Sequence, residues 1–397
     1  MRLPRTVIAL GFVSFFTDFS SEMIYPLLPV FLSSVLGVGA LALGIIEGIA
    51  ESTASLLKVF SGIWTDRSGR RKPLLVVGYS LAGLARPLIG LATVWPFVLV
   101  MRFLDRIGKG LRTSPRDALI AGVTDPGQRG TAFGFHRAMD HAGAVIGPLV
   151  AAALLALEGV SLRHVFLLAA LPAAVVIVVL LTAVQEPPRA FEKESKTLNL
   201  RRHWHELGRD FKFLLLALLV FTLGNSTDAF LLLRLSEAGV PASWIAVLWS
   251  VHSGVKMIST SYGGPLSDRV GRRPLILLGW AFYALIYFAF ALTSSSAGLI
   301  VVFLAYGIYF GFTEPSEKAW VADLVPAQLR GTAFGYYNGI IGLGALPASL
   351  IFGFLWRTWG VTTAFLTGAG FAAAASVLLL VSVKTPDPRR SRESLRR

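Results

Sequence analysis

The feature that most constrains the fold of this chain is a charged ten-residue segment that occurs twice. Residues 62–71 read Gly-Ile-Trp-Thr-Asp-Arg-Ser-Gly-Arg-Arg, and residues 264–273 read Gly-Pro-Leu-Ser-Asp-Arg-Val-Gly-Arg-Arg. The copies lie 202 positions apart in a chain of 397 residues, and each lies between two long apolar runs. A charged turn between two helices of membrane length, once in each half, predicts a duplicated membrane protein. We expect such a protein to move something across that membrane.

Two further segments match between the halves in the same order. Residues 113–115 (Thr-Ser-Pro) correspond to residues 313–315 (Thr-Glu-Pro), and residues 129–134 and 330–335 both read Arg-Gly-Thr-Ala-Phe-Gly. All offsets lie between 200 and 202 positions. Repeats of this size related by an axis along the membrane normal are a recurrent transporter architecture, in which the substrate binds near the mid-plane between the halves.

The composition fits a membrane protein and excludes several classes of function. Apolar residues make up 54% of the chain and charged residues 15%, whereas a soluble protein carries about a quarter charged residues. The chain has no cysteine, which excludes disulfides and thiolate metal sites. Because the sequence contains no phosphate-binding glycine loop, paired-histidine metal motif or nucleophile elbow, we expect neither an enzyme nor an ATP-driven pump, and no metal or cofactor.

The net charge of +14 indicates membrane topology rather than nucleic-acid binding. Basic residues cluster in alternate loops, whereas the intervening loops at 33–40, 92–95 and 293–298 carry no charge. This positive-inside pattern predicts a multi-pass protein of the cell (inner) membrane with both termini in the cytoplasm. The apolar run at the N-terminus lacks a small-residue cleavage site and contains Asp18 and Glu22, so we interpret it as a retained first helix.

Repeated runs of roughly 20 apolar residues predict twelve membrane-spanning helices. The expected spans are residues 6–34, 40–64, 73–92, 95–123, 130–157, 163–184, 211–235, 242–266, 274–292, 298–324, 331–356 and 361–383. The predicted fold class is an all-α membrane protein with two pseudo-symmetric six-helix bundles, residues 1–184 and 211–383. Residues 185–210, opened by two prolines, form the expected cytoplasmic linker, with a short surface helix near 200–208, and residues 384–397 form a basic cytoplasmic tail.

These features together resemble the major facilitator superfamily over nearly the whole chain. The two charged turns are similar to the family's cytoplasmic motif between helices 2 and 3 and between helices 8 and 9. An aspartate beside arginines can form ion pairs and can face the positive end of a neighbouring helix. We predict that the turns latch the halves together on the cytoplasmic side; the alternative is that their charge only retains the loops inside. The predicted gating residues are Asp66, Arg67, Arg70, Arg71, Asp268, Arg269, Arg272 and Arg273.

A second signature lies on the predicted fifth helix. Gly134, Gly143, Gly147 and Pro148 resemble the antiporter motif of the twelve-helix drug–proton exchangers. Alanines stand at positions 151 and 152, where that motif usually has two glycines. Small residues at this spacing let helices pack closely. The resemblance implies, in addition, a bend at the Gly-Pro pair that controls leakage, and transport by exchange with protons.

Charged side chains inside the predicted spans are candidate functional residues, because each costs a few kcal/mol near the bilayer centre unless it is paired or hydrated. A static buried network is the alternative, since acids and bases nearly balance in the first half. Depths estimated from a rise of about 1.5 Å per residue predict an outer cluster of Glu22, Glu47 and Arg102 and a central cluster of Asp18, Glu51, Asp105 and Arg106. The candidate cavity residues are Asp18, Glu22, Glu51, Arg102, Asp105, Arg106, Asp228 and Glu314.

Proton coupling requires a group whose protonation responds to its surroundings. Burial disfavours a charged carboxylate and a nearby cation favours it, so small movements can bind or release a proton. We predict this role for Asp18, Glu22 and Asp228, with Glu314 behind them. Lone histidines in helices are usually hydrogen-bonded packing residues, and we interpret His136, His141 and His252 in this way.

The sequence leaves the substrate open between two alternatives. The first is proton-coupled export of small organic molecules, such as drugs or metabolites. The second is proton-coupled transport of an organic anion or metal chelate, which the basic face of the fourth helix favours. That face carries Arg102, Arg106, Lys109, Thr113 and Arg116. As partners we expect a small-molecule substrate, protons and the lipid bilayer, with no nucleic acid, and we expect a monomer.

Overall fold

The computed structural model describes residues 3–37, 40–186, 204 and 206–382, and every regular element in that part of the chain is helical. The first half contains α1 (Arg5–Glu22), α2 (Leu28–Val30), α3 (Ala40–Ser68), α4 (Lys72–Leu88), α5 (Trp95–Val123), α6 (Arg129–Leu155), α7 (Leu162–Leu168) and α8 (Ala170–Thr182). The second half contains α10 (Arg209–Gly224), α11 (Ala229–Glu237), α12 (Ala242–Val270), α13 (Arg272–Leu292), α14 (Ser296–Leu324) and α15 (Arg330–Ser382). Residues 187–203 and 205 of the expected linker, which include most of its expected surface helix, and the basic tail lie outside the described residues.

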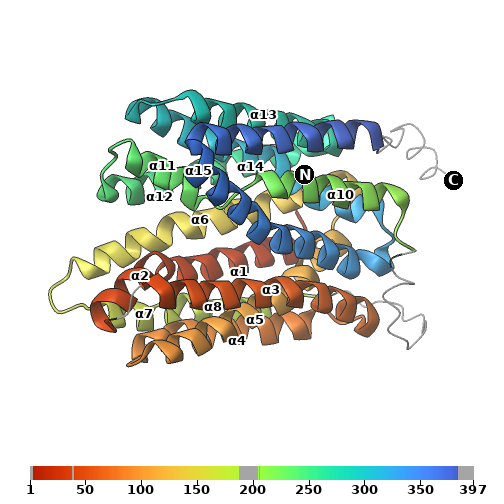
Figure 1. The fold of residues 1–397 in the computed structure, drawn as a ribbon. Helices are drawn as coiled ribbons and strands as arrows, with labels where there is room; N and C mark the ends of the chain where they lie inside the picture. Colours follow the sequence, from red (N-terminus) through yellow and green to blue (C-terminus); the bar gives the residue numbers. More distant parts are fainter. Residues whose placement is uncertain (1–2, 38–39, 187–203, 205, 383–397) are drawn as a thin grey trace.

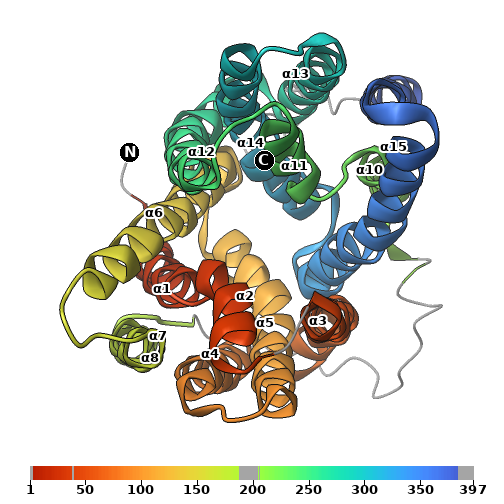
Figure 2. The same cartoon turned by 60° about the vertical axis from the view of Figure 1, so that its left-hand side comes forward.

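The helices form two groups that lie side by side, one from each half of the chain (Figure 1). Figure 2 shows α6 beside α12 and α3 beside α15, where the two groups meet. We call the end of the bundle where α8 ends and α10 begins the linker end. The charged turn after α3 lies at this end, because Glu186, just beyond α8, accepts hydrogen bonds from the backbone N–H groups of Arg71 (2.7 Å) and Lys72 (2.9 Å). The turn after α12 lies there too: Gly122 near the end of α5 is beside Arg71, and Arg272 donates to the carbonyl of Pro126 just beyond α5.

The twelve crossings predicted from the sequence are consistent with the helices observed. Eight helical segments of the described chain are long and apolar enough to cross a membrane. One of them, residues 327–381, is long enough for two crossings and is interrupted at Gly360, whose φ of 87° leaves the helical region. The remaining three, α3, α5 and α12, have 29 residues each. At a rise of about 1.5 Å per residue, such a helix exceeds the roughly 30 Å of a hydrocarbon core.

The first helix of each half is broken, which the sequence analysis did not predict. Continuous helices were expected over residues 6–34 and 211–235, but α1 ends at Glu22 and α10 ends at Gly224, 202 positions later. A 3₁₀ turn with Pro26 follows α1, because proline has no N–H to continue the helical bonding. Polar residues 225–228 follow α10, and their side chains compete with the backbone for hydrogen bonds.

Glycines allow the two halves to touch at their backbones near the linker end. A Cβ atom on Gly62 would meet the carbonyl oxygen of Gly331, and one on Gly264 would meet that of Gly130. Gly134 lies on the same surface, where a Cβ would come within 2.8 Å of the Gly264 Cα atom. The two interfaces, α3 with α15 and α12 with α6, are therefore equivalent under the repeat. Such contacts bring helices together closely enough for short polar groups to bond across the interface.

Candidate functional site

Each aspartate of the repeated turn binds the first turn of a helix in the opposite half. Asp66 at the end of α3 accepts hydrogen bonds from the backbone N–H groups of Gly331 (2.9 Å) and Thr332 (2.6 Å), at the start of α15. The first N–H groups of a helix have no partner within the helix, and its N-terminus carries a partial positive charge. The Asp66 carboxylate accepts hydrogen bonds from two of these N–H groups, and its negative charge faces the positive end of α15. We call this contact the first latch.

The second copy makes the same contact with the roles of the halves exchanged. Asp268 near the end of α12 accepts hydrogen bonds from the N–H groups of Gly130 (2.9 Å) and Thr131 (2.7 Å), at the start of α6. The Thr131 hydroxyl donates to the same carboxylate at 2.6 Å. We call this contact the second latch. The Arg-Gly-Thr segment that is repeated in the sequence therefore supplies the partner of each aspartate. The segment occupies matching positions in both halves, and this repetition was the available sign of its role.

The basic residues of the two turns are arranged less symmetrically than their sequences. Arg272 bonds Asp268 at 2.5 Å and Asp323 at 3.2 Å, and it donates to the carbonyl of Pro126 across the interface at 2.9 Å. Asp323 also pairs with Arg129 of the first half, a contact that the sequence analysis missed. Arg273 instead donates to carbonyls of α15 within its own half, and Arg71 is buried beside Gly122 of α5. The remaining three predicted gating residues are exposed, namely Arg67, Arg70 and Arg269.

A cavity of about 660 Å³ lies between the two halves. Six of the eight candidate cavity residues line it, namely Asp18, Glu22, Arg102, Asp105, Arg106 and Glu314. The side chains of Glu47 and Glu51 lie outside the described part of the chain. Asp228 is not among the lining residues, so the candidates do not form one site.

Asp105 is the centre of a buried ion-pair cluster in the first half. Its carboxylate is bonded by Arg86 of α4 at 2.6 Å and by Arg102 at 3.2 Å. Arg106 lies near enough to attract the carboxylates of both Asp105 and Glu22. Arg102 had been placed by depth in the outer cluster, but its side chain reaches one turn along α5 to the central Asp105. The two predicted clusters are therefore joined, and Arg86 is a member that the sequence analysis did not assign.

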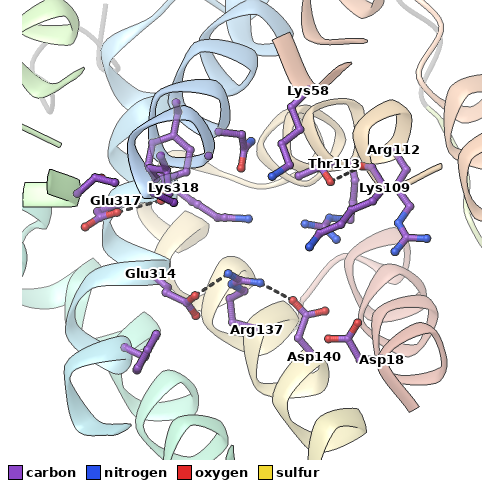
Figure 3. A pocket seen from close by; sticks show the side chains of 18 of the residues that line it. Asp18, Lys58, Lys109, Arg112, Thr113, Arg137, Asp140, Glu314, Glu317 and Lys318 are labelled. Atoms are coloured by element: carbon purple, nitrogen blue, oxygen red, sulfur yellow. Dashed lines mark hydrogen bonds and ion pairs between the residues drawn. The ribbon is translucent and has the colours of Figure 1, made fainter. Parts of the chain in front are cut away.

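A chain of polar contacts crosses between the halves on the floor of the cavity (Figure 3). Arg137 of α6 donates to Asp140 on its own helix at 2.7 Å and to Glu314 of α14 at 2.5 Å. His141 lies 3.3 Å from the other oxygen of Glu314, so it has the hydrogen-bond partner expected of a lone histidine in a helix. Asp18 lies beside Asp140 in Figure 3, and among the described residues its carboxylate has no ion pair.

A second ion pair joins the halves close by. Lys318 of α14 lies 2.7 Å from Asp117 of α5, and both side chains are almost fully buried. Arg116 bonds the other oxygen of Asp117 at 3.0 Å. Because the partners are 201 positions apart, hydropathy and helix periodicity gave no sign of this contact.

Asp228 belongs to a separate polar group in the second half. It follows the break after α10 and lies 3.4 Å from the ammonium group of Lys256 and 3.2 Å from the Tyr306 hydroxyl. His252 stacks on Phe303 nearby, with ring centroids 4.5 Å apart, and is fully buried, as is His136 in the first half. Both histidines are packing residues as expected, but neither ring has the expected hydrogen-bond partner among the described residues.

The glycines of α6 place it directly against α1 at the acidic candidates. A Cβ on Gly143 would lie 3.1 Å from the Asp18 Cβ, and one on Gly147 would lie 2.9 Å from the Glu22 Cβ. Pro148 lies inside α6, which remains a single helix to Leu155. These small residues therefore determine how closely the two acidic side chains approach α6.

Comparison with known proteins identifies the family. Residues 10–315 and 235–397 match the family model described as Major Facilitator Superfamily. The chain belongs to this superfamily. An uncharacterized MFS-type transporter of Methanocaldococcus jannaschii is 33% identical over 387 residues, which cover 95% of each chain. The multidrug resistance protein MdtG of Escherichia coli is 26% identical over 92% of this chain and 91% of MdtG.

The fold is also similar to solved structures. The crystal structure of the human organic anion transporter MFSD10 has a TM-score of 0.80 and covers 94% of this chain and 99% of its own, at 17% identity. At that identity the likeness concerns the fold. This member of the superfamily is therefore a multi-pass membrane transporter and not an enzyme.

Proposed function

We propose that this transporter exports small organic molecules in exchange for protons, by exposing its cavity alternately to the two sides of the membrane. The observation that carries the proposal is a polar cavity between two halves that are bonded to each other at the linker end by both latches. Breaking these contacts would open the cavity towards the linker end. The latches then act as gates, as the sequence analysis predicted.

Charge supports an orientation with the linker end in the cytoplasm. The two turns, the linker and the tail each carry a cluster of basic residues, and basic loops remain on the cytoplasmic side. With this orientation, the latched state faces the outside of an inner membrane. Opening the latches lets the transporter collect its substrate from the cytoplasm, as export requires.

The floor of the cavity offers a route for proton coupling. Arg137 is shared between Asp140 of its own half and Glu314 of the other half. A proton on either carboxylate would weaken its bond to the guanidinium, because the bond would lose its ionic character. Asp18 lies beside Asp140, and a proton on Asp18 would remove the repulsion between the two carboxylates. Binding or release of a proton here would therefore change the strength of the contact between the halves.

Export is supported by the relatives and by α6. MdtG is named a multidrug resistance protein, and it aligns with nearly the whole chain. The antiporter-like glycines Gly143 and Gly147 hold α6 against α1 at Asp18 and Glu22. Closely packed backbone at this position would keep water and protons from passing beside the acidic groups.

The second candidate function is proton-coupled transport of an organic anion or metal chelate. The basic side chains that line the cavity favour it. Replacing Arg106 by Ala distinguishes the two candidates in a transport assay. Loss of transport for anionic solutes alone would support the second candidate. A loss for neutral and cationic solutes as large as that for anionic solutes would support a general structural role for Arg106.

The test is accumulation of a panel of labelled solutes in cells that express the transporter, with and without a protonophore. We expect expressing cells to accumulate less of at least one solute, and the protonophore to remove the difference. Asp18→Asn is expected to abolish the pH-driven component while the protein still reaches the membrane. The exposed Glu158 provides a matched control as Glu158→Gln. Undiminished proton coupling in Asp18→Asn would refute the assignment of Asp18.

A further inference from the structure

Basic residues are concentrated on one wall of the cavity. Nine basic and six acidic residues line it, and the first half supplies eight of the nine basic ones. If Glu47 and Glu51, whose side chains are outside the described residues, were counted as well, basic lining residues would still outnumber acidic ones. The basic lining residues from the first half are Lys58, Arg86, Arg102, Arg106, Lys109, Arg112, Arg116 and Arg137. A cavity with this excess attracts anions.

Arg112 differs from the paired arginines of the same wall. Arg86 and Arg102 bond Asp105, and Arg116 bonds Asp117. Arg112 is only 5% exposed, and its guanidinium lies over the ring of Tyr79, 4.3 Å from the ring centroid. Its Nη1 atom is buried and donates no hydrogen bond within the described chain.

An unused donor on a buried guanidinium is costly, because the group has left water without gaining an acceptor. The planar guanidinium matches the two oxygens of a carboxylate or phosphate. Stacking on Tyr79 also fixes the plane of the group before a ligand arrives. Arg112 therefore has the chemistry of a preorganised oxyanion binder at the edge of the cavity.

Further cations lie on the same side. Figure 3 shows Lys58 of α3 together with Lys109 and Arg112 of α5, opposite Glu317 and Lys318 of α14. Lysine ammonium groups add positive charge around a bound anion without demanding one geometry. Two helices of the first half thus contribute to the same positive region.

The opposite wall is suited to the organic part of a molecule. It contains Leu218 and Phe221 from α10 and Tyr309 and Phe310 from α14, with the amide of Asn225 at the break after α10. The cavity volume of about 660 Å³ is that of a site for a small organic ligand. A molecule with an anionic head and an apolar or aromatic body would therefore contact both halves at once.

We propose that Arg112 is the centre of an oxyanion subsite, which holds the carboxylate or phosphate head of a small organic anion while its body lies against Phe221 and Phe310. This inference rests on the proposed function, because the bound anion would be the transported substrate. It assigns the head to the first half and the body to the second. The substrate would then span the interface that must rearrange during transport.

The test is binding to the full-length chain purified in detergent, measured as a shift of the thermal unfolding temperature at constant ionic strength. The probes are phenylphosphate, inorganic phosphate, benzylammonium and benzyl alcohol. We expect phenylphosphate to stabilise the protein most, inorganic phosphate less, and the cationic and neutral compounds not at all. Arg112→Gln should weaken phenylphosphate binding by about tenfold or more, which corresponds to about 1.4 kcal/mol.

Two further variants keep this test decisive. Arg357 is an exposed arginine on α15, and Arg357→Gln should bind phenylphosphate as the parent does. Arg112→Lys retains the charge but loses the planar fork, so it should bind phenylphosphate several-fold more weakly even if Arg112→Gln does not fold. Unchanged affinity in either folded Arg112 variant would overturn the proposal, as would stronger stabilisation by benzylammonium than by phenylphosphate.

The result is separable from the proposed function, because binding in detergent needs no transport. If proteoliposomes exchange a neutral or cationic solute while no oxyanion binds through Arg112, the subsite is wrong and proton-coupled export stands. If oxyanions bind through Arg112 but no solute responds to a proton gradient, the subsite stands and the proposed function is wrong.

Discussion

Removing both latch carboxylates should open the linker end. In the Asp66→Ala/Asp268→Ala double variant, four backbone N–H groups at the starts of α15 and α6 lose their acceptors. Loss of a capping side chain costs about 0.5–2 kcal/mol. If the two distant latches act independently, the latched state loses about 1–4 kcal/mol relative to the opened state. At about 1.4 kcal/mol per factor of ten, the ratio of latched to opened molecules falls by about fivefold to several-hundredfold.

The absence of cysteine makes this change measurable with two spin labels. Gly127 and Gln328 are exposed residues in equivalent loops of the two halves at the linker end, and they can be replaced by cysteine. Electron–electron dipolar spectroscopy should show longer label distances in the double variant than in the parent, and an intermediate effect for each single variant. Glu158→Ala, at an exposed site away from the latches, should leave the distances unchanged.

An unchanged distance distribution in a folded Asp66→Ala/Asp268→Ala variant would show that the two carboxylates do not determine which state is populated. In that case the turns would serve only to retain the loops in the cytoplasm, which is the alternative that the sequence left open.

Three further predictions concern packing and charge. Gly264→Val should also lengthen the label distances, because a side chain there would meet the backbone of Gly130 and Gly134. Gly370→Val is the control, since a Cβ at that position would meet nothing within 4 Å. Equal effects of the two substitutions would contradict the packing argument. Arg86→Ala should lower the free energy of unfolding by about 3–5 kcal/mol, seen as a lower melting temperature in detergent, since Asp105 loses a buried partner at 2.6 Å, whereas Arg357→Ala should have no effect. Arg137→Gln and Glu314→Gln should show a coupling energy of about 0.5–3 kcal/mol in a double-mutant cycle of thermal unfolding, and additive effects would mean that their ion pair is not formed.

The fold was predictable because its signals are local. Apolar runs, charged turns and the repeat of about 201 positions together indicate the number and order of the helices. The breaks after Glu22 and Gly224 were missed because the spans that contain them are still apolar enough on average to cross a membrane. Pro26 and the polar residues 225–228 were the available local signs, since they weaken helical hydrogen bonding.

The candidate site was predictable only in part, because its contacts connect distant positions. Asp66 was expected at a helix N-terminus, but the particular helix lies 265 residues away in sequence. Arg137 and Glu314 are 177 residues apart, and the residue pattern of neither helix indicates that these two side chains form a pair. The depth of a residue along its helix gives the position of its backbone but not that of the charged group of a long side chain. The guanidinium of Arg102, which bonds Asp105, is an example.

The most direct test of the account is the access of a thiol reagent to the cavity from each side of the membrane. Ala345 lines the cavity on α15 and is exposed to it, so Ala345→Cys introduces a unique thiol. With the linker end in the cytoplasm, a membrane-impermeant reagent should label this cysteine in intact cells and label it poorly in inverted vesicles. Adding Asp66→Ala and Asp268→Ala should reverse that preference. Equal labelling from both sides, or a preference that the latch substitutions leave unchanged, would contradict a cavity whose access is controlled by the two latches.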